Sequence, residues 1–155
     1  MIWKELDESL IFTKVKAQNW EEILKIAGNA MQNKGYARES YVQALIEREI
    51  KYPTGIDMGE TGIAIPHTDI SEVKKEGMAI ITLEDPVAFG QMGTEKDQIM
   101  VEIVLVLAIK ESGNQVEHLK QIMSLIQDKE VRDKLKNAKN SHSIVDIIRQ
   151  KEESL

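Results

Sequence analysis

The sequence predicts an α/β fold: a single layered domain in which a mixed β-sheet is flanked by helices on both faces. Helical hydrophobic periodicity occupies residues 19–50 and returns after residue 113, whereas short β-branched runs fill the middle of the chain. One run, residues 99–109, is apolar on both alternations except at Glu102, which is typical of a central strand covered on both faces. No repeat, linker or low-complexity tract divides the chain, so we expect one domain over 1–155.

The first third of the chain predicts a strand followed by two helices. Residues 10–16 begin apolar and then alternate apolar with polar side chains, as in a strand. Asn19 with Glu22 three positions later is a helix-start signature, and Gly35 is a natural stop. A second helix is predicted over 39–50 and ends at the Tyr-Pro-Thr-Gly sequence that follows.

The remaining elements follow in order. A loop over 55–62, rich in glycine and turn formers, should lead into a strand at 63–65. Residues 78–83 predict another strand, and one proline and two glycines between it and the central strand indicate a loop or short hairpin. Three helices should close the chain, the last one short, with apolar stripes over 119–126, 131–135 and 144–148.

Composition excludes several classes of function. The net charge of −6 argues against duplex DNA or RNA and against an anionic membrane as the main partner. The chain has no cysteine, so it holds no disulfide, zinc–thiolate site or cysteine nucleophile. The longest apolar run, 103–109, is far shorter than the ~20 residues that span a bilayer. Because residues 1–5 do not resemble a signal peptide, we expect a cytoplasmic location.

The tract from Gly62 to Thr68 carries the most specific chemical signal. A β-prone run, Ile63-Ala64-Ile65, meets Pro66, which cannot donate to a sheet ladder, and His67 follows at once. The histidine should therefore stand at a strand end on a stiff scaffold. A neutral imidazole placed there can act as a nucleophile, a base or a metal ligand.

A second histidine and one arginine can join this site. His118 lies in the first turns of the helix that follows the central strand, at the sheet edge where α/β folds usually bind ligands. If His67 and His118 meet there, one ring can attack phosphorus while the other stabilises the phosphoryl group. Arg48 can add charge stabilisation, because a guanidinium recognises phosphate oxygens in a planar, bidentate way.

Each of these residues also has a purely structural reading. His67 can satisfy a backbone carbonyl, His118 can cap its own helix, and Arg48, between two glutamates, can form a solvated ion pair. Asp69 either orients the ring of His67 or closes a turn, and His142 is expected at the surface. A histidine–carboxylate metal site stays open as a minor alternative, although no HExxH-like pair exists. The sequence contains no nucleotide-binding glycine loop, and we expect no cofactor and no metal.

Three motifs together resemble the enzyme IIA components of the bacterial sugar phosphotransferase system, fructose–mannitol type. They are the hexapeptide 62–67, the helix and turn 41–56, and the segment Glu117-His118-Leu119, and they occur in the family's order over nearly the whole chain. The longer approach through 57–61, with Thr68 in place of a common glycine, is closer to the galactitol-like branch. The resemblance leaves the roles of Asp69, Glu60 and His142 open.

The resemblance implies a phosphohistidine carrier. His67 would accept a phosphoryl group from the carrier protein HPr and pass it to a cysteine of enzyme IIB, while His118 and Arg48 stabilise the charge. Because this chain lacks cysteine and any membrane span, IIB and the sugar transporter would be separate polypeptides. The alternative is a regulatory module of the same family, in which phosphorylation of His67 controls a protein partner rather than sugar uptake.

Overall fold

A five-stranded mixed sheet organises the computed structural model, which describes residues 1–110 and 115–155. The strand order is β1-β4-β5-β3-β2. β1 pairs parallel to β4 and β3 parallel to β5, whereas β4–β5 and β2–β3 are antiparallel. The strands are β1 (Ile11–Val15), β2 (Gly55–Asp57), β3 (Gly62–Ala64), β4 (Gly77–Gly90) and β5 (Gln98–Ala108).

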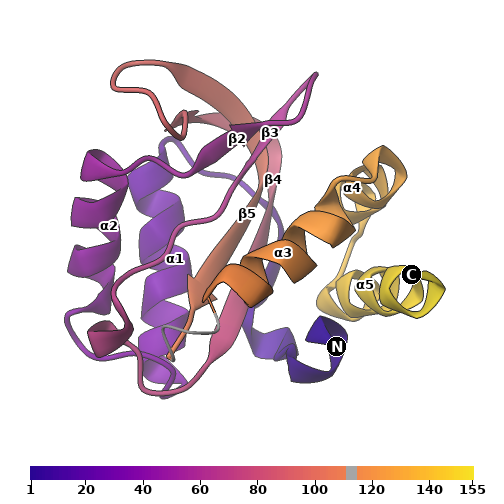
Figure 1. Cartoon of the computed structure of the whole chain (residues 1–155), viewed down its shortest axis with the longest axis horizontal. Coiled ribbons are helices and arrows are strands. Elements are labelled where there is room, and N and C mark those ends of the chain that lie inside the picture. Colours follow the sequence, from indigo (N-terminus) through magenta and orange to yellow (C-terminus); the bar gives the residue numbers. More distant parts are fainter. Residues whose placement is uncertain (111–114) are drawn as a thin grey trace.

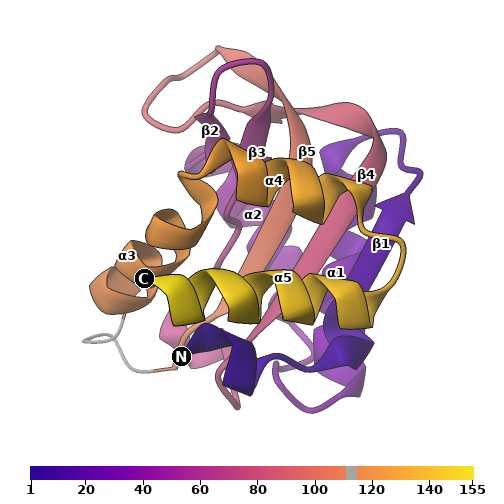
Figure 2. The ribbon, with the colours of Figure 1, turned by 90° about the vertical axis from the view of Figure 1, so that its right-hand side faces the viewer.

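Helices cover both faces of this sheet, as the sequence predicts. Figure 1 shows α1 and α2 on one side of the strands and α3, α4 and α5 on the other, and Figure 2 looks onto the second side. The helices are α1 (Trp20–Asn33), α2 (Tyr41–Lys51), α3 (Gln115–Ile126), α4 (Lys129–Asn137) and α5 (Ser141–Ser154), with 3-10 turns η1 (Ile2–Glu5), η2 (Glu8–Leu10) and η3 (Ile70–Glu72). Among the described residues, none of the helices is long and apolar enough to cross a membrane.

The signals at the helix ends are confirmed for α1 and need revision for α5. The side chain of Asn19 accepts the backbone N–H of Glu22 at 2.9 Å, and Gly35 adopts φ +82° just beyond the helix. At α5, the side chain of Asn140 accepts the N–H of Ser143 at 2.8 Å, so the cap precedes Ser141. This last helix runs for 14 residues and is not short.

β5 is the central strand that its composition indicates. Val104, Val106 and Ala108 belong to the core cluster beneath α1 and α2, whereas Leu105 and Leu107 belong to the cluster beneath α3–α5. Successive side chains of a strand point to opposite faces, so a strand between two helical layers needs apolar residues at both parities. This explains why the alternation expected of a half-exposed strand is missing from the β5 sequence.

Two segments are more extended than the sequence predicts. The expected loop over 55–62 contains β2, because Gly55 to Asp57 pair with Ala64 to Gly62 in a short hairpin. β4 does not end near 83 but continues to Gly90, and its register against β5 shifts between Thr82 and Val87. Pro86 lies within that irregularity. Because the β-ladder is already interrupted there, the absent N–H of the proline costs no ladder hydrogen bond.

Candidate functional site

His67 stands at the carboxyl end of β3, beside the central strand. β3 ends at Ala64, before the proline. The carbonyl of Pro66 still accepts the N–H of Leu107 at 2.9 Å, and His67 pairs with Leu107 as an isolated bridge. Pro66 lacks only its donor, so its carbonyl keeps the segment against β5 after the strand has ended. The imidazole is half-buried at this sheet edge.

The ring of His67 makes a hydrogen bond through one nitrogen and none through the other among the described residues. Nδ1 lies 2.9 Å from the carbonyl oxygen of Ile65. A carbonyl oxygen can only accept, so in the neutral ring the proton sits on Nδ1 and Nε2 carries the lone pair. A hydrogen bond to a backbone carbonyl is what a purely structural role of His67 predicts. The same bond also leaves Nε2 able to act as a nucleophile.

The pKa of His67 is lowered from its usual value, which keeps the imidazole neutral. Burial is the main cause, and the Arg48 guanidinium acts in the same direction. The hydrogen bond to Ile65 and the charge of Asp69 oppose this shift. A lowered pKa means that the folded state resists protonation, so this contribution to stability is present above pH 6.5 and is lost as the pH falls through the folded pKa.

An open hollow of about 460 Å³ lies in front of this ring, and we call it the His67 hollow. Its far wall is the turn between β4 and β5, where the N–H of Met92 donates to the carbonyl of Gly55 at 2.8 Å. Gly90 approaches Pro53 so closely that a Cβ there would come within 2.8 Å of the ring. The lining residues are Arg48, Lys51, Tyr52, Pro53, Thr54, His67, Met92, Gly93, Thr94 and Glu95.

Arg48 brings a positive charge into the His67 hollow from the last turn of α2. Its Nη1 lies 3.7 Å from Asp69 Oδ1, and its guanidinium lies over the ring of Tyr52 at 5.3 Å. The Asp69 side chain is 83% exposed, so this ion pair is weak. Arg48 Nε is buried and has no hydrogen-bond partner among the described residues. Because Nη1 is held, in the described part of the chain, only by the weak ion pair with Asp69, it keeps donors for an incoming anion such as a phosphoryl group.

Buried hydrogen bonds at the two ends of α2, which the sequence analysis missed, fix this helix beside His67. At its start, the hydroxyl of Tyr41 donates to the carbonyl of Leu107 at 3.2 Å. At its end, the carboxyl of Glu49 accepts the N–H of Thr54 at 2.7 Å and its hydroxyl at 2.5 Å. Glu49 continues the buried stripe of α2, and a carboxylate in such a stripe was the signal available in the sequence.

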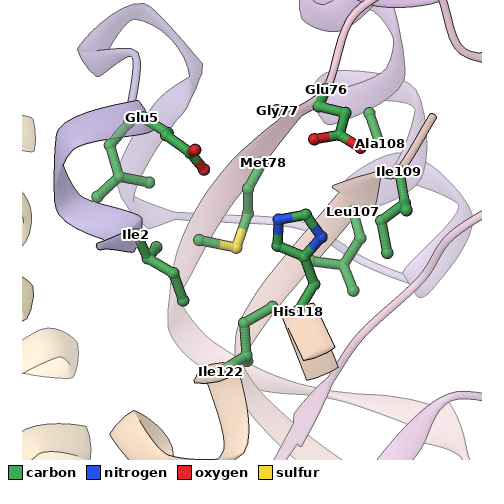
Figure 3. Close-up of a pocket in the computed structure, with 11 residues that line it drawn as sticks. Ile2, Glu5, Glu76, Gly77, Met78, Leu107, Ala108, Ile109, His118 and Ile122 are labelled. Atoms are coloured by element: carbon green, nitrogen blue, oxygen red, sulfur yellow. The ribbon is translucent and has the colours of Figure 1, made fainter. Parts of the chain in front are cut away.

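His118 is in the first turn of α3, as predicted, but it lines a different pocket. Figure 3 shows its ring between Met78 and Leu107, in a pocket whose lining also includes Ile2 and Glu76. We call this cavity of about 40 Å³ the His118 pocket; its lining also includes Glu5, Leu6, Gly77, Ala108, Ile109 and Ile122. Its lining shares no residue with that of the His67 hollow.

The structure therefore places Arg48 and His67 in one hollow, whereas His118 lines another pocket. The reason lies in the layering: α2 packs on one face of the sheet and α3 on the other (Figure 1). Both histidines do stand at the same sheet edge, since His67 bridges Leu107 and α3 follows the end of β5. His118 Nδ1 is buried with no hydrogen-bond partner in the described ranges.

The other polar candidates lie elsewhere. Asp69 pairs with Arg48 and precedes η3, and the hydrogen bond of the His67 ring goes to Ile65 rather than to Asp69. His142 is exposed and lies between the carboxylates of Glu8 and Asp146, at 3.7 and 3.4 Å. Glu60 lines a charged cavity beside α4. Within 1–110 and 115–155, no group of three or more His, Cys, Asp or Glu side chains is arranged to hold a metal ion.

Comparison with known proteins gives one consistent result. Residues 4–151 match the family model described as phosphoenolpyruvate-dependent sugar phosphotransferase system, EIIA 2. The galactitol-specific EIIA component of Escherichia coli K12 is 30% identical over 110 residues, which cover 71% of this chain and 73% of that protein.

Two solved structures share the fold. The crystal structure of the mannitol IIA protein of Escherichia coli has a TM-score of 0.76 at 25% identity, covering 92% of this chain and 98% of that one. The IIA chain in a complex of mannitol IIA with phosphorylated mannitol IIB, also from Escherichia coli, has a TM-score of 0.77 at 23% identity, covering 94% and 97%.

Proposed function

Because this chain belongs to the EIIA 2 family of the phosphoenolpyruvate-dependent sugar phosphotransferase system, whose members are phosphoryl carriers, we propose that it carries the phosphoryl group on Nε2 of His67. The observation that supports this most directly is the hydrogen bond from Nδ1 to Ile65, which leaves Nε2 with its lone pair. Arg48 lies in the same hollow to receive the negative charge. The proposed location is the cytoplasm, where the donor protein would be available.

The transfer step needs no cofactor. The lone pair on Nε2 attacks phosphorus of phosphorylated HPr, the N–P bond of the donor breaks, and a new N–P bond forms on His67. No proton has to leave Nε2 first, since the proton of the neutral ring is on Nδ1. The guanidinium of Arg48 stabilises the equatorial oxygens during transfer. The lowered pKa of His67 favours the neutral, reactive ring at pH 7.

The proposed acceptor is a cysteine of an enzyme IIB on a separate chain. The support is the solved complex of a mannitol IIA with phosphorylated IIB, whose IIA chain shares this fold. A galactitol-like sugar is the proposed cargo of the system, since a galactitol-specific component is among the relatives. This carrier would contact proteins and never the sugar itself.

His118 is proposed to stabilise the phosphorylated state. It stands at the same sheet edge as His67, and its Nδ1 makes no hydrogen bond to the described residues. His118 lines a different pocket from His67, so the proposed role is auxiliary, in contrast to that of Arg48, which lines the His67 hollow itself.

A reconstituted phosphotransfer assay tests this function. Phosphoenolpyruvate, enzyme I and HPr should phosphorylate the purified chain on one histidine, observed as phosphohistidine by ³¹P NMR. Adding candidate IIB proteins should move the label to a IIB cysteine. Absence of label on the wild-type chain would reject the carrier function, and label that no IIB removes would favour the regulatory alternative.

A further inference from the structure

A line of buried hydrogen bonds connects α2 to the ring of His67. Glu49 is only 4% exposed, and its two carboxyl oxygens receive the N–H and the hydroxyl of Thr54. The carbonyl of Thr54 accepts the N–H of Ile65 at 3.3 Å. The carbonyl of Ile65 then accepts Nδ1–H of His67 at 2.9 Å. Each group in the line is held by the group before it.

We propose that Glu49 is a positioning residue for His67, acting through Thr54 and the Ile65 carbonyl to hold the imidazole with Nε2 facing the His67 hollow. This inference rests on the proposed function, in which Nε2 is the phosphoryl acceptor. Glu49 itself does not touch the reacting atoms. It acts by fixing the peptide whose carbonyl selects the tautomer of the ring.

The position of Glu49 links both partners of the reaction. It is the neighbour of Arg48 on α2, while Thr54 and His67 line the same hollow. The link from Glu49 to Thr54 therefore sets the distance between the charge-stabilising guanidinium and the nucleophile. Transfer depends steeply on such distances, because a 1 Å misplacement can cost roughly 100-fold in rate. A surface ion pair could not supply this rigidity, since it competes with water.

The charge of Glu49 can change in the range where the carrier works. Burial raises the pKa of Glu49 to about 7, while the hydrogen bonds from Thr54 and the charge of Arg48 lower it in part. The ionised carboxylate accepts from both Thr54 groups. Protonation turns one oxygen into an O–H donor and leaves a neutral acid, which is a weaker acceptor than the carboxylate, so the hold on Thr54 weakens as the pH falls below about 7. The positioning should therefore be stronger above this pH.

Two disruptive variants, each compared with a conservative substitution at the same position, test the inference in the full-length chain. Glu49→Ala removes the carboxylate, and Thr54→Val removes only the hydroxyl. Thr54→Ser keeps the hydroxyl and should restore wild-type behaviour. Glu49→Gln keeps the shape, removes the titratable group and replaces one of the two acceptor oxygens by an amide nitrogen, which cannot accept from Thr54. Glu47→Gln, an exposed change of the same charge on the same helix, is the matched control.

Two readouts separate positioning from a purely structural role. Long-range ¹H–¹⁵N NMR of the imidazole should show the Nδ1–H tautomer of His67 in wild type, Thr54→Ser and Glu47→Gln. It should show a mixture with Nε2–H in Glu49→Ala and Thr54→Val. Single-turnover transfer from phosphorylated HPr should slow roughly tenfold in these two variants. The concentration of phosphorylated HPr that gives half the maximal rate should not change. In Glu49→Gln, the part of the fall in rate that occurs near pH 7 should disappear, which leaves the fall that protonation of His67 causes below pH 6.5.

A wild-type tautomer together with a wild-type rate in Thr54→Val would overturn the inference, as would an unchanged pH profile in Glu49→Gln. If Glu49→Ala does not fold, these two variants still decide the question. The NMR arm does not depend on phosphotransfer. If the wild-type chain is not phosphorylated, the proposed function is rejected. The tautomer measurement would still show whether Glu49 positions the ring of His67.

Discussion

The two histidine sites of this protein stand at one sheet edge but are built in different ways. Around His67, the ring is held through Nδ1 by the carbonyl of Ile65, and the hollow opens to solvent beside a guanidinium. Around His118, the walls are mostly apolar, the cavity is small and Nδ1 is unpartnered among the described residues. A hydrogen bond therefore fixes the first ring before any partner arrives, whereas the second ring has no such bond at Nδ1. The predictions below test this division.

Removing the nucleophile should have the largest effect. In His67→Ala, phosphorylation by phosphoenolpyruvate, enzyme I and HPr should be abolished, because the lone pair that attacks phosphorus is gone. The measurement is incorporation of ³²P. His142→Ala is the control, since His142 is exposed on α5, and it should label normally. Undiminished labelling of His67→Ala would assign the acceptor to another residue.

Replacing the charged partner should be the next largest change. Arg48→Gln should slow acceptance roughly 10- to 100-fold, because a neutral amide stabilises the transferring phosphoryl group less than a guanidinium. The rate constant is measured by rapid quench at saturating phosphorylated HPr. Arg149→Gln, an arginine change on α5 across the sheet, should leave the rate unaltered. Equal rates for Arg48→Gln and wild type would place the charge stabilisation elsewhere.

The His118 pocket predicts a smaller and later effect. His118→Ala should accept the phosphoryl group at close to the wild-type rate but pass it to IIB about tenfold more slowly. The two steps are separated by loading the variant first and then adding IIB. A loss on acceptance as large as that of Arg48→Gln would show that the two rings act together from the start, and the distinction between the sites would fall.

The smallest effect concerns protonation. In the wild type, the pKa of His67 followed by NMR should lie below 6.5, because burial and Arg48 disfavour the imidazolium. Arg48→Gln should raise this pKa and Asp69→Asn should lower it. Protonation of the ring should therefore add a fall in the rate of acceptance at a pH below 6.5, once His67 becomes charged. A pKa above 6.5 in the wild type would contradict the neutral, preorganised ring.

The strand-end position of His67 could be predicted because local chemistry determines it. Pro66 removes a ladder donor, which favours a strand end close to it, and β3 does end at Ala64. The helix cap at Asn19 and the two-sided burial of β5 were predictable for the same reason, since composition within a few residues decides them.

The misjudged features depend on contacts between distant segments. β4 passes through Pro86 only because Val87–Gly90 finds a partner in β5, and β2 forms only because β3 lies beside it. The face on which His118 points is set by the packing of α3, and periodicity alone cannot choose between two layers. The sequence shows Glu49 as a charged residue in an apolar helical stripe. Its hydrogen-bond partner, Thr54, can be identified only once the turn after α2 has folded.

The turn between β4 and β5 has a consequence for how this scaffold can diversify. It forms the outer wall of the His67 hollow, yet none of its residues contributes a hydrogen bond to the ring or to the link through Thr54. Its tip includes Gly93 at φ +79°. Insertions or substitutions in this turn would change the shape of the entrance to the His67 hollow and leave Nε2 of His67 in place. The choice of protein partner can therefore change, by evolution or by design, while the phosphoryl-transfer chemistry at His67 stays the same.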